Sequence, residues 1–436
     1  MTFLIIILAI ALQIFLSVKK VSPFISLLFV AILTGLCLGM QPVDLLKSIE
    51  KGVGSTLGGV ALIICLGAVL GKILEVSGAA EKIAVTLINS FGEKNIQWAV
   101  LLTGFLIGIP LYYNAGFIIL VPLVFMLAKK TGLPLLYIAI PMAAGLSTTH
   151  CFLPPHPGPS LLVNAFRADM GRTLIYGLCI AIPAVIIAGP LLGRRMKKIN
   201  ITGLNLFSSA ESSLPVKLPA ALPSFLIALM PVLLITASVI AENFLNKGLL
   251  QTILLFIGNS NIALLLTVLA AFAYFGIRNK VKMDTQMKWL NDAISGIAVI
   301  LLIITAGGVF KQVLDDSGTD DYISSFSKKL EMPPLFFAWV VTALLRVTIG
   351  SATVAAITAA GVVAPLLAQS NVSPELMVLA VGSGSVFGSH INDSGFWMFK
   401  EFFKLSLKQT FLSWTVMETT ISIIGLIGVL FLNAIV

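Results

Sequence analysis

The sequence predicts an all-α membrane protein built from two inverted-topology repeats. Hydrophobic residues make up 58% of the 436 residues and charged residues only 11%, whereas soluble domains carry about 25% charged residues. Residues 67–83 match residues 307–323 with six identities, at an offset of 240. Two of the three histidines, His150 and His390, have the same separation (390 − 150 = 240). In an apolar chain, a duplicated polar segment indicates a transporter's central site.

Apolar stretches near the 20 residues needed to span a bilayer recur along the chain. We expect ten crossings, five in each repeat, at residues 3–18, 21–40, 57–76, 134–168 (interrupted), 172–192, 220–241, 261–277, 289–310, 374–405 (interrupted) and 410–433. The first crossing is retained, because residues 1–18 lack the basic start and small-residue cleavage site of a signal peptide. The first repeat is then 1–192, the second is 220–436, and 193–219 is a cytoplasmic linker.

Two further apolar stretches, residues 97–128 and 335–368, have small or polar residues at their centres. Pro110 and Gly116 in the first, and Gly350 in the second, favour a break in a continuous helix. We therefore expect one re-entrant helical hairpin in each repeat. Irregular backbone at that depth requires protein or a water-filled cavity around it.

The formal charge of +9 reflects basic loops between spans, which is the positive-inside pattern and not a nucleic-acid surface. An orientation with both termini periplasmic places all the strong basic clusters in the cytoplasm, namely 19–20, 129–130, 194–198, 278–282 and 400–408. The four cysteines lie in apolar segments without metal-ligand spacing. We expect no cofactor and no metal.

Both interrupted spans are predicted to unwind at a polar segment. Pro154, Pro155 and Pro157 break the first span, because proline cannot continue a helix. The following half-helix, near 159–165, would present a positive N-terminus suited to an anion. In the second interrupted span, glycines within residues 382–395 break the helix in the same way. His150 and His390 are expected at the enclosed site, and His156 belongs either to that site or to the proline-rich break itself.

Arg346 is the only arginine or lysine between Glu331 and Lys400, and a buried guanidinium needs a counter-charge. The substrate's carboxylate or Asp393 would supply it, and we favour the substrate slightly. The remaining expected substrate-binding residues are Asn114, Thr149, His150, His156, Thr348, Ser351, Thr353, Ser389, His390 and Asn392. Groups that could change charge during transport are Asp393, His390, His150 and Glu418.

The chain resembles the gluconate permease family of bacterial sugar-acid:proton symporters. The resemblance rests on 149–159 (THCFLPPHPGP), 350–355 (GSATVA), 389–397 (SHINDSGFW) and 413–419 (SWTVMET), and it extends over essentially the whole chain. It implies a multi-pass carrier of the bacterial inner membrane that moves gluconate or related aldonates, with D-serine and glycerate carriers as relatives. The family often has an acid where this chain has Asn114, which changes either the proton coupling or the substrate.

The leading hypothesis is proton-coupled import of a small hydroxylated monocarboxylate, with the lipid bilayer and the anionic substrate as partners. A sodium-coupled carboxylate carrier, a D-serine or glycerate carrier, and an ion channel are alternatives. A membrane-embedded metal-dependent hydrolase using the three histidines is a remote one, because HExxH is absent. We therefore expect a transporter and not an enzyme. A homodimer is compatible with this build, although no segment marks an interface.

Overall fold

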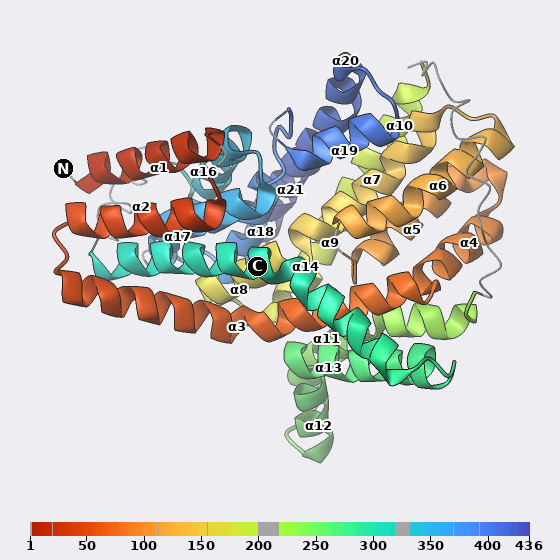
Figure 1. Cartoon of the computed structure of the whole chain (residues 1–436), viewed down its shortest axis with the longest axis horizontal. Helices are drawn as coiled ribbons and strands as arrows, with labels where there is room; N and C mark the ends of the chain where they lie inside the picture. Colours follow the sequence, from red (N-terminus) through yellow and green to blue (C-terminus); the bar gives the residue numbers. More distant parts are fainter. Residues whose placement is uncertain are drawn as a thin grey trace.

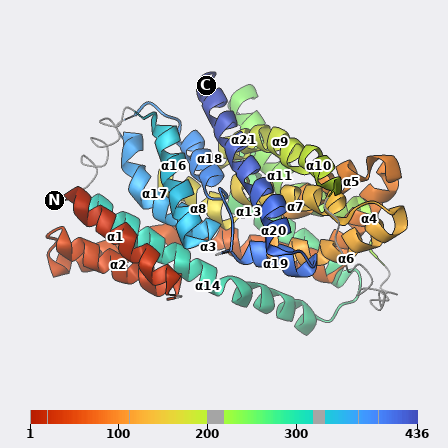
Figure 2. The ribbon, with the colours of Figure 1, turned by 90° about the horizontal axis from the view of Figure 1, so that it is seen from above.

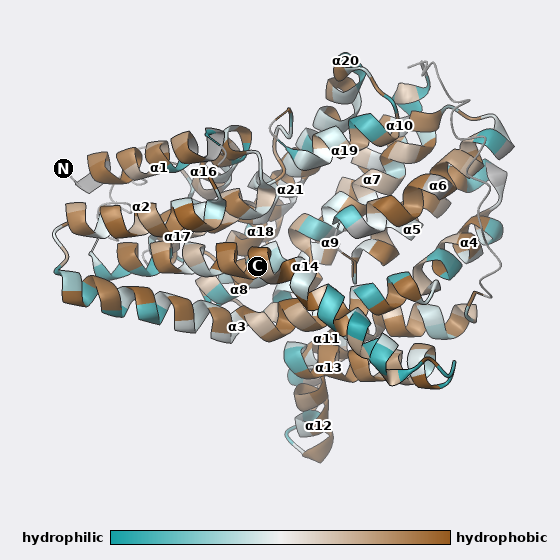
Figure 3. Cartoon of the chain, in the orientation of Figure 1, coloured by the Kyte–Doolittle hydropathy of each residue, from teal (hydrophilic) through white to brown (hydrophobic). Residues whose placement is uncertain are grey.

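The computed structural model describes the chain apart from Met1, Lys20, Tyr112, Pro155, residues 199–217, residues 319–331, Gln369 and Asn392. The described residues form helices and connecting segments, without a strand among them (Figure 1). Seven of these helices are long and apolar enough to cross a membrane, and apolar residues cover most of the ribbon (Figure 3). The protein is therefore an all-helical, multi-pass membrane protein. Most of the expected linker, 193–219, lies outside the described residues.

The described residues of the first part of the chain form ten α-helices. They are α1 (Thr2–Val18), α2 (Pro23–Cys37), α3 (Pro42–Val76), α4 (Ala79–Phe91), α5 (Ile96–Gly108), α6 (Tyr113–Thr131), α7 (Leu135–Phe152), α8 (Pro157–Phe166), α9 (Met170–Ile186) and α10 (Leu192–Arg195). A π-helical segment, Ile187–Leu191, joins α9 to α10 and contains Pro190, whose missing N–H disturbs the regular hydrogen bonds.

The second part of the chain has corresponding helices. They are α11 (Ala221–Phe244), α12 (Leu249–Ile257), α13 (Ser260–Ala271), α14 (Met283–Asp316), α16 (Pro334–Ile349), α17 (Ala352–Ala368), α18 (Pro374–Gly384), α19 (Ser394–Phe402), α20 (Leu407–Thr410) and α21 (Val416–Asn433). Adding 240 to the bounds of α3 gives 282–316, within one residue of α14. The same shift takes α5 to 336–348, inside α16. Helices α4 and α12 lie outside the crossings and hairpins predicted from the sequence.

Four helix breaks lie where proline or glycine interrupts an apolar stretch. The chain leaves a helix between α5 and α6, between α7 and α8, between α16 and α17, and between α18 and α19. Gly350 ends α16 with φ of +85°, a left-handed conformation that glycine adopts without the steric cost of a Cβ atom. Pro157 begins α8, where its fixed φ suits the first turn and its missing N–H is not needed.

Glycines allow the helices that carry these breaks to pack closely. A Cβ atom on Gly104 of α5 would lie 2.5 Å from the Met142 carbonyl oxygen of α7, and one on Gly145 would lie 2.6 Å from the Phe105 amide nitrogen. The long helices α3 and α14 pack extensively against each other. Small residues at helix crossings are the usual means of close contact in membranes.

The broken helices occupy the middle of the molecule. Both views place α8 and α18 between α17 on one side and α7 on the other (Figures 1 and 2), and α8 packs against both α17 and α18. The residues of α18 after Pro374 are buried, as are nearly all those of α7. Their polar residues are therefore enclosed by protein and lie away from lipid.

Candidate functional site

A cavity of about 410 Å³ lies where three of the four breaks meet. Its apolar wall includes Ile300 and Ile303 of α14 and Ile349 at the end of α16. Its polar lining comes from both parts of the chain and consists of Tyr113, Asn114, Ser147, His150, Arg346, Ser351, Thr353, Asp393, Ser394, Trp414 and Glu418. A small polar solute enclosed here would contact the two parts of the chain together.

Three helices begin at the cavity. Tyr113 and Asn114 are the first residues of α6, Ser351 and Thr353 stand at the start of α17, and Ser394 is the first residue of α19. The first N–H groups of a helix have no partner within the helix, and they carry a partial positive charge. Such ends favour an anion; Asp393 already caps α19, and the ends of α6 and α17 remain for a solute.

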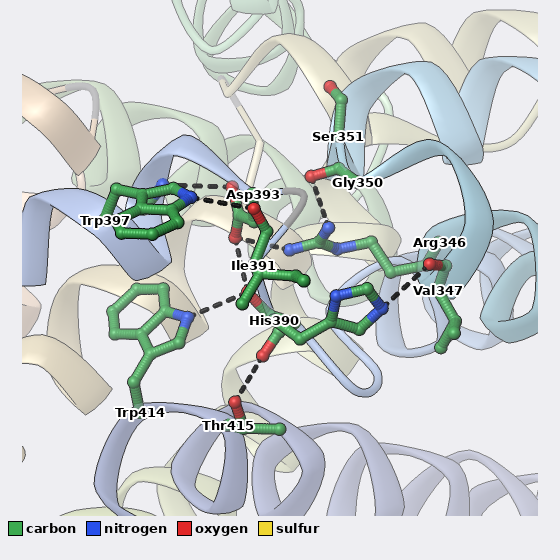
Figure 4. A network of polar contacts seen from close by, with 12 residues as sticks. Arg346, Val347, Gly350, Ser351, His390, Ile391, Asp393, Trp397, Trp414 and Thr415 are labelled. Atoms are coloured by element: carbon green, nitrogen blue, oxygen red, sulfur yellow. Dashed lines mark hydrogen bonds and ion pairs between the residues drawn. The ribbon is translucent and has the colours of Figure 1, made fainter. Parts of the chain in front are cut away.

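Arg346 and Asp393 form a buried ion pair at this cavity (Figure 4). The Arg346 Nη2 atom lies 2.5 Å from the Asp393 Oδ2 atom, and the two side chains are 3% and 14% exposed. The Nη1 group of Arg346 donates to the Gly350 carbonyl oxygen, which fixes the guanidinium against the end of its own helix. Its Nε–H group is buried without a hydrogen-bond partner. Of the two counter-charges considered for Arg346, Asp393 is thus the one that the protein itself provides.

The carboxylate of Asp393 accepts several further hydrogen bonds. It caps α19, because its Oδ1 atom accepts from the Gly395 amide at 3.0 Å. The Ser389 hydroxyl donates to Oδ2, and Trp414 Nε1 donates to the Ser389 oxygen at 2.8 Å. Thr415 also donates to the Ser389 carbonyl oxygen at 2.6 Å. This network joins α16, the break before α19 and the start of α21 into one polar unit (Figure 4).

Glu418 of α21 faces the same cavity without a comparable set of partners. It is 2% exposed, and its Oε1 atom has no hydrogen-bond partner. The Tyr113 hydroxyl and His150 Nδ1 are likewise buried without a partner. Buried polar atoms normally have partners, so these three are available to a solute or to a proton.

The sequence profile of the GntP family permeases matches residues 1–436. The chain belongs to the GntP permease family. It is 49% identical over 418 residues to the high-affinity gluconate transporter of Escherichia coli (strain K12), with 96% of this chain and 95% of that protein covered. It is 46% identical over 423 residues to the Gnt-II system L-idonate transporter of the same strain, with 95% of each covered.

The fold also resembles a solved transporter structure. The YdaH transporter of Alcanivorax borkumensis superimposes with a TM-score of 0.69, covering 95% of this chain and 98% of that one, at 16% sequence identity. At this identity the likeness describes the fold alone. Family membership makes this GntP permease a transport protein and not an enzyme, so the hydrolase hypothesis is set aside.

Of the residues expected at the site, the cavity of this permease brings together Asn114, His150, Arg346, Ser351, Thr353, Asp393 and Glu418. Others lie nearby with their polar groups directed elsewhere. The Thr149 hydroxyl donates to the carbonyl oxygens of Gly145 and Leu146 in its own helix. Thr348 does the same with Leu344 and Leu345.

Two of the expected histidines contact backbone carbonyls outside the cavity lining. His156 Nε2 is 2.5 Å from the Gly108 oxygen, and His390 Nε2 is 3.0 Å from the Val347 oxygen. The His156 imidazole therefore lies against the end of α5, and the His390 imidazole lies against the last turn of α16. Asn392 lies outside the described residues.

Four polar lining residues of this permease were not expected from the sequence, namely Tyr113, Ser147, Ser394 and Trp414. Ser147 is three residues before His150 and therefore on the same helix face, so helical spacing was an available signal. Trp414 is four residues before Glu418 on the last span, so helical spacing also placed it on the face of an expected residue. Tyr113 adjoins the expected Asn114 at the hairpin break.

Proposed function

We propose that this permease imports gluconate, or a related small hydroxylated monocarboxylate, together with a proton across the bacterial inner membrane. The observation that carries the proposal is the cavity itself, which combines a buried arginine, three helix N-termini and several polar side chains. Gluconate has one carboxylate and a chain of hydroxyl groups, which suits this mixture. The gluconate and L-idonate transporters to which the chain is similar are named for substrates of this class.

The substrate carboxylate would bind between Arg346 and the first turn of α17. The Nε–H group of Arg346 is without a partner, and Ser351 and Thr353 line the cavity beside it. Charge-assisted hydrogen bonds to a guanidinium are about twice as strong as neutral ones. The hydroxyl chain would then extend toward Asn114 and His150, which lie on the first part of the chain.

Transport would follow from movement between the two repeats. We propose that they are inverted, with residues 97–128 and 335–368 as hairpins that end near the middle of the membrane, and with both chain termini periplasmic. A site formed by broken helices of two repeats becomes accessible from alternate sides when one repeat moves against the other. The homodimer stays a prediction.

The test is uptake of labelled gluconate into proteoliposomes under an inward proton gradient, repeated with an uncoupler and with sodium. Accumulation that collapses with the uncoupler and is independent of sodium supports proton symport. Accumulation that requires sodium contradicts it and favours the sodium-coupled alternative. Absence of gluconate uptake by folded protein contradicts the substrate, and D-serine, glycerate and other aldonates are then the compounds to test.

Arg346 provides a sharper test of the substrate's position. Arg346→Gln should reduce gluconate affinity by about 30-fold or more, since losing one partner of a buried charged pair costs about 2–5 kcal/mol. Arg278→Gln is the matched control, because Arg278 is exposed and stacks over Tyr274 away from the cavity. Wild-type affinity in Arg346→Gln would contradict the proposed carboxylate contact.

A further inference from the structure

The two acids that line the cavity have different surroundings. Asp393 is bonded to the Arg346 guanidinium, to the Ser389 hydroxyl and to the Gly395 amide. Three donors, one of them a permanent cation, stabilise its ionised form. Asp393 is therefore a fixed negative charge that balances Arg346, and it is poorly suited to exchange a proton during each transport cycle.

Glu418 has much less of this stabilisation, because its carboxyl group is hydrogen-bonded to the neutral Ser147 hydroxyl and its Oε1 atom has no partner. The titratable groups nearest to it are Tyr113 from α6, His150 and Cys151 from α7, Arg346 from α16, and Asp393 before α19. Arg346 is the one permanent cation among these described groups, and it is already bonded to Asp393. An ionised Glu418 would thus be a buried carboxylate with a negatively charged neighbour, an arrangement that is costly inside a membrane protein.

A bound monocarboxylate increases this cost. With substrate present, ionised Glu418 would share one cavity of about 410 Å³ with the substrate carboxylate and Asp393, against the single charge of Arg346. Like charges in a weakly polar environment repel strongly. A proton on Glu418 removes one negative charge and leaves an O–H group that can donate to a substrate hydroxyl.

We propose that Glu418 is the group that carries the co-transported proton, and that Asp393 serves as the constant counter-ion of Arg346. The proposal rests on the proposed proton-coupled transport and assigns its proton to one carboxyl group. A proton from the outer side binds the Glu418 carboxylate as the anion enters the cavity, and it leaves to the cytoplasm after the anion does. Because the coupling of two ligands is reciprocal, each favours binding of the other.

The histidines are less suited to this role. His390 does not line the cavity, and its Nε2 atom faces the Val347 oxygen. His150 does line the cavity, but its protonation would place a second cation near Arg346. His150 is therefore the alternative carrier that the experiment has to separate from Glu418.

The experiment measures proton uptake when gluconate is added to purified permease in weakly buffered detergent solution with a pH-sensitive dye. Wild type should take up about one proton per gluconate bound, and its Kd should rise about tenfold per pH unit once Glu418 is ionised. Glu418→Gln should bind gluconate with no proton uptake and a Kd independent of pH. In proteoliposomes it should catalyse exchange but not gradient-driven accumulation. Glu401→Gln, which alters an exposed acid on α19, is the control and should behave as wild type.

The outcomes separate this assignment from the proposed function. Undiminished proton uptake in Glu418→Gln overturns the assignment, leaves proton symport intact and directs attention to His150. Absence of proton uptake in the wild type overturns proton symport and the assignment with it. Where Glu418→Gln does not fold, Glu418→Asp replaces it. That variant keeps a titratable carboxyl group, so it should retain proton uptake with a shifted midpoint pH, and an unchanged midpoint overturns the assignment.

Discussion

Replacing Asp393 with asparagine would leave the Arg346 guanidinium buried without its counter-charge. The guanidinium is 3% exposed, and its other hydrogen bond goes to the neutral Gly350 carbonyl oxygen. Removing one partner of a buried ion pair typically destabilises a protein by about 3–5 kcal/mol. Asp393 is 14% exposed, and asparagine can still accept the Gly395 hydrogen bond, so we expect the lower end, about 3 kcal/mol. This corresponds to roughly a hundredfold shift in the folding equilibrium.

The same substitution should increase the stabilisation that gluconate provides. With Asp393 replaced and Glu418 protonated, the substrate carboxylate becomes the anion that balances Arg346 and restores the interaction that the variant lost. Ligand at 100 times its Kd stabilises a protein by about 2.7 kcal/mol, and a lower Kd in Asp393→Asn would raise this value at a fixed gluconate concentration. The assay is thermal unfolding in detergent, with and without saturating gluconate.

An exposed ion pair provides the control for this prediction. Asp44→Asn removes the pair with Lys47, whose side chains are 61% and 72% exposed. Exposed pairs contribute about 0–1 kcal/mol, so this variant should unfold near the wild-type temperature with the wild-type gluconate shift. If Asp393→Asn matched the control in both measurements, Arg346 would depend neither on Asp393 nor on the substrate for its charge balance.

Two further substitutions test the helix packing and the break between α5 and α6. Gly145→Ala should lower the thermal stability by about 1–3 kcal/mol, because its Cβ atom would lie 2.6 Å from the Phe105 amide nitrogen. Gly58→Ala is the control, because the space around its Cβ position is open, and this variant should keep the wild-type thermal stability. An equal loss of stability in both variants would contradict the packing argument. Asn114→Asp adds an acid to the cavity lining, so gluconate uptake should fall more steeply with rising pH as that acid ionises and repels the substrate. An identical pH profile would mean that position 114 does not sense the substrate.

The helix breaks could be predicted from the sequence because proline and glycine act locally. Pro157 begins α8 whatever packs around it, and Gly350 ends α16 because its left-handed conformation excludes most other residues. The pairing of Arg346 with Asp393 was also accessible as one of two alternatives, since a buried guanidinium requires a nearby anion. Local rules and charge balance therefore located the cavity approximately.

The rotation of each helix about its axis could not be predicted in the same way. On α7, Ser147 and His150 face the cavity, whereas Thr149 faces α5. A Cβ atom on Gly108 would lie 2.2 Å from the Thr149 hydroxyl oxygen, so the two helices are in contact at that point. Which face of α7 lines the cavity, and which packs against another helix, depends on contacts between residues distant in sequence. By residue type alone, Thr149 and Ser147 were equally good candidates for the cavity lining.

The histidines show that matching positions in the two parts of the chain have different surroundings. The offset of 240 residues pairs His150 with His390, yet it is His156 that resembles His390 in its contacts, because each lies against a carbonyl oxygen near the end of a helix, α5 for His156 and α16 for His390. The helix ends explain the difference. Helix α7 continues to Phe152, so His150 is still helical, whereas α18 ends at Gly384 and His390 lies within the unwound segment.

Proline and glycine interrupt a helix in different ways, which accounts for this asymmetry. Prolines start the next helix readily, and the first break is correspondingly short, between Phe152 and Pro157. Glycines and serines favour no early restart, and the second break extends from Gly384 to Ser394. The longer break carries Asp393 at the N-terminus of α19, where it can reach Arg346. The shorter break leaves His150 on the cavity wall beside Ser147. Positions 240 residues apart in the two parts of the chain thus provide different chemistry. The cavity takes its counter-ion pair from the second part and its uncharged polar groups from both.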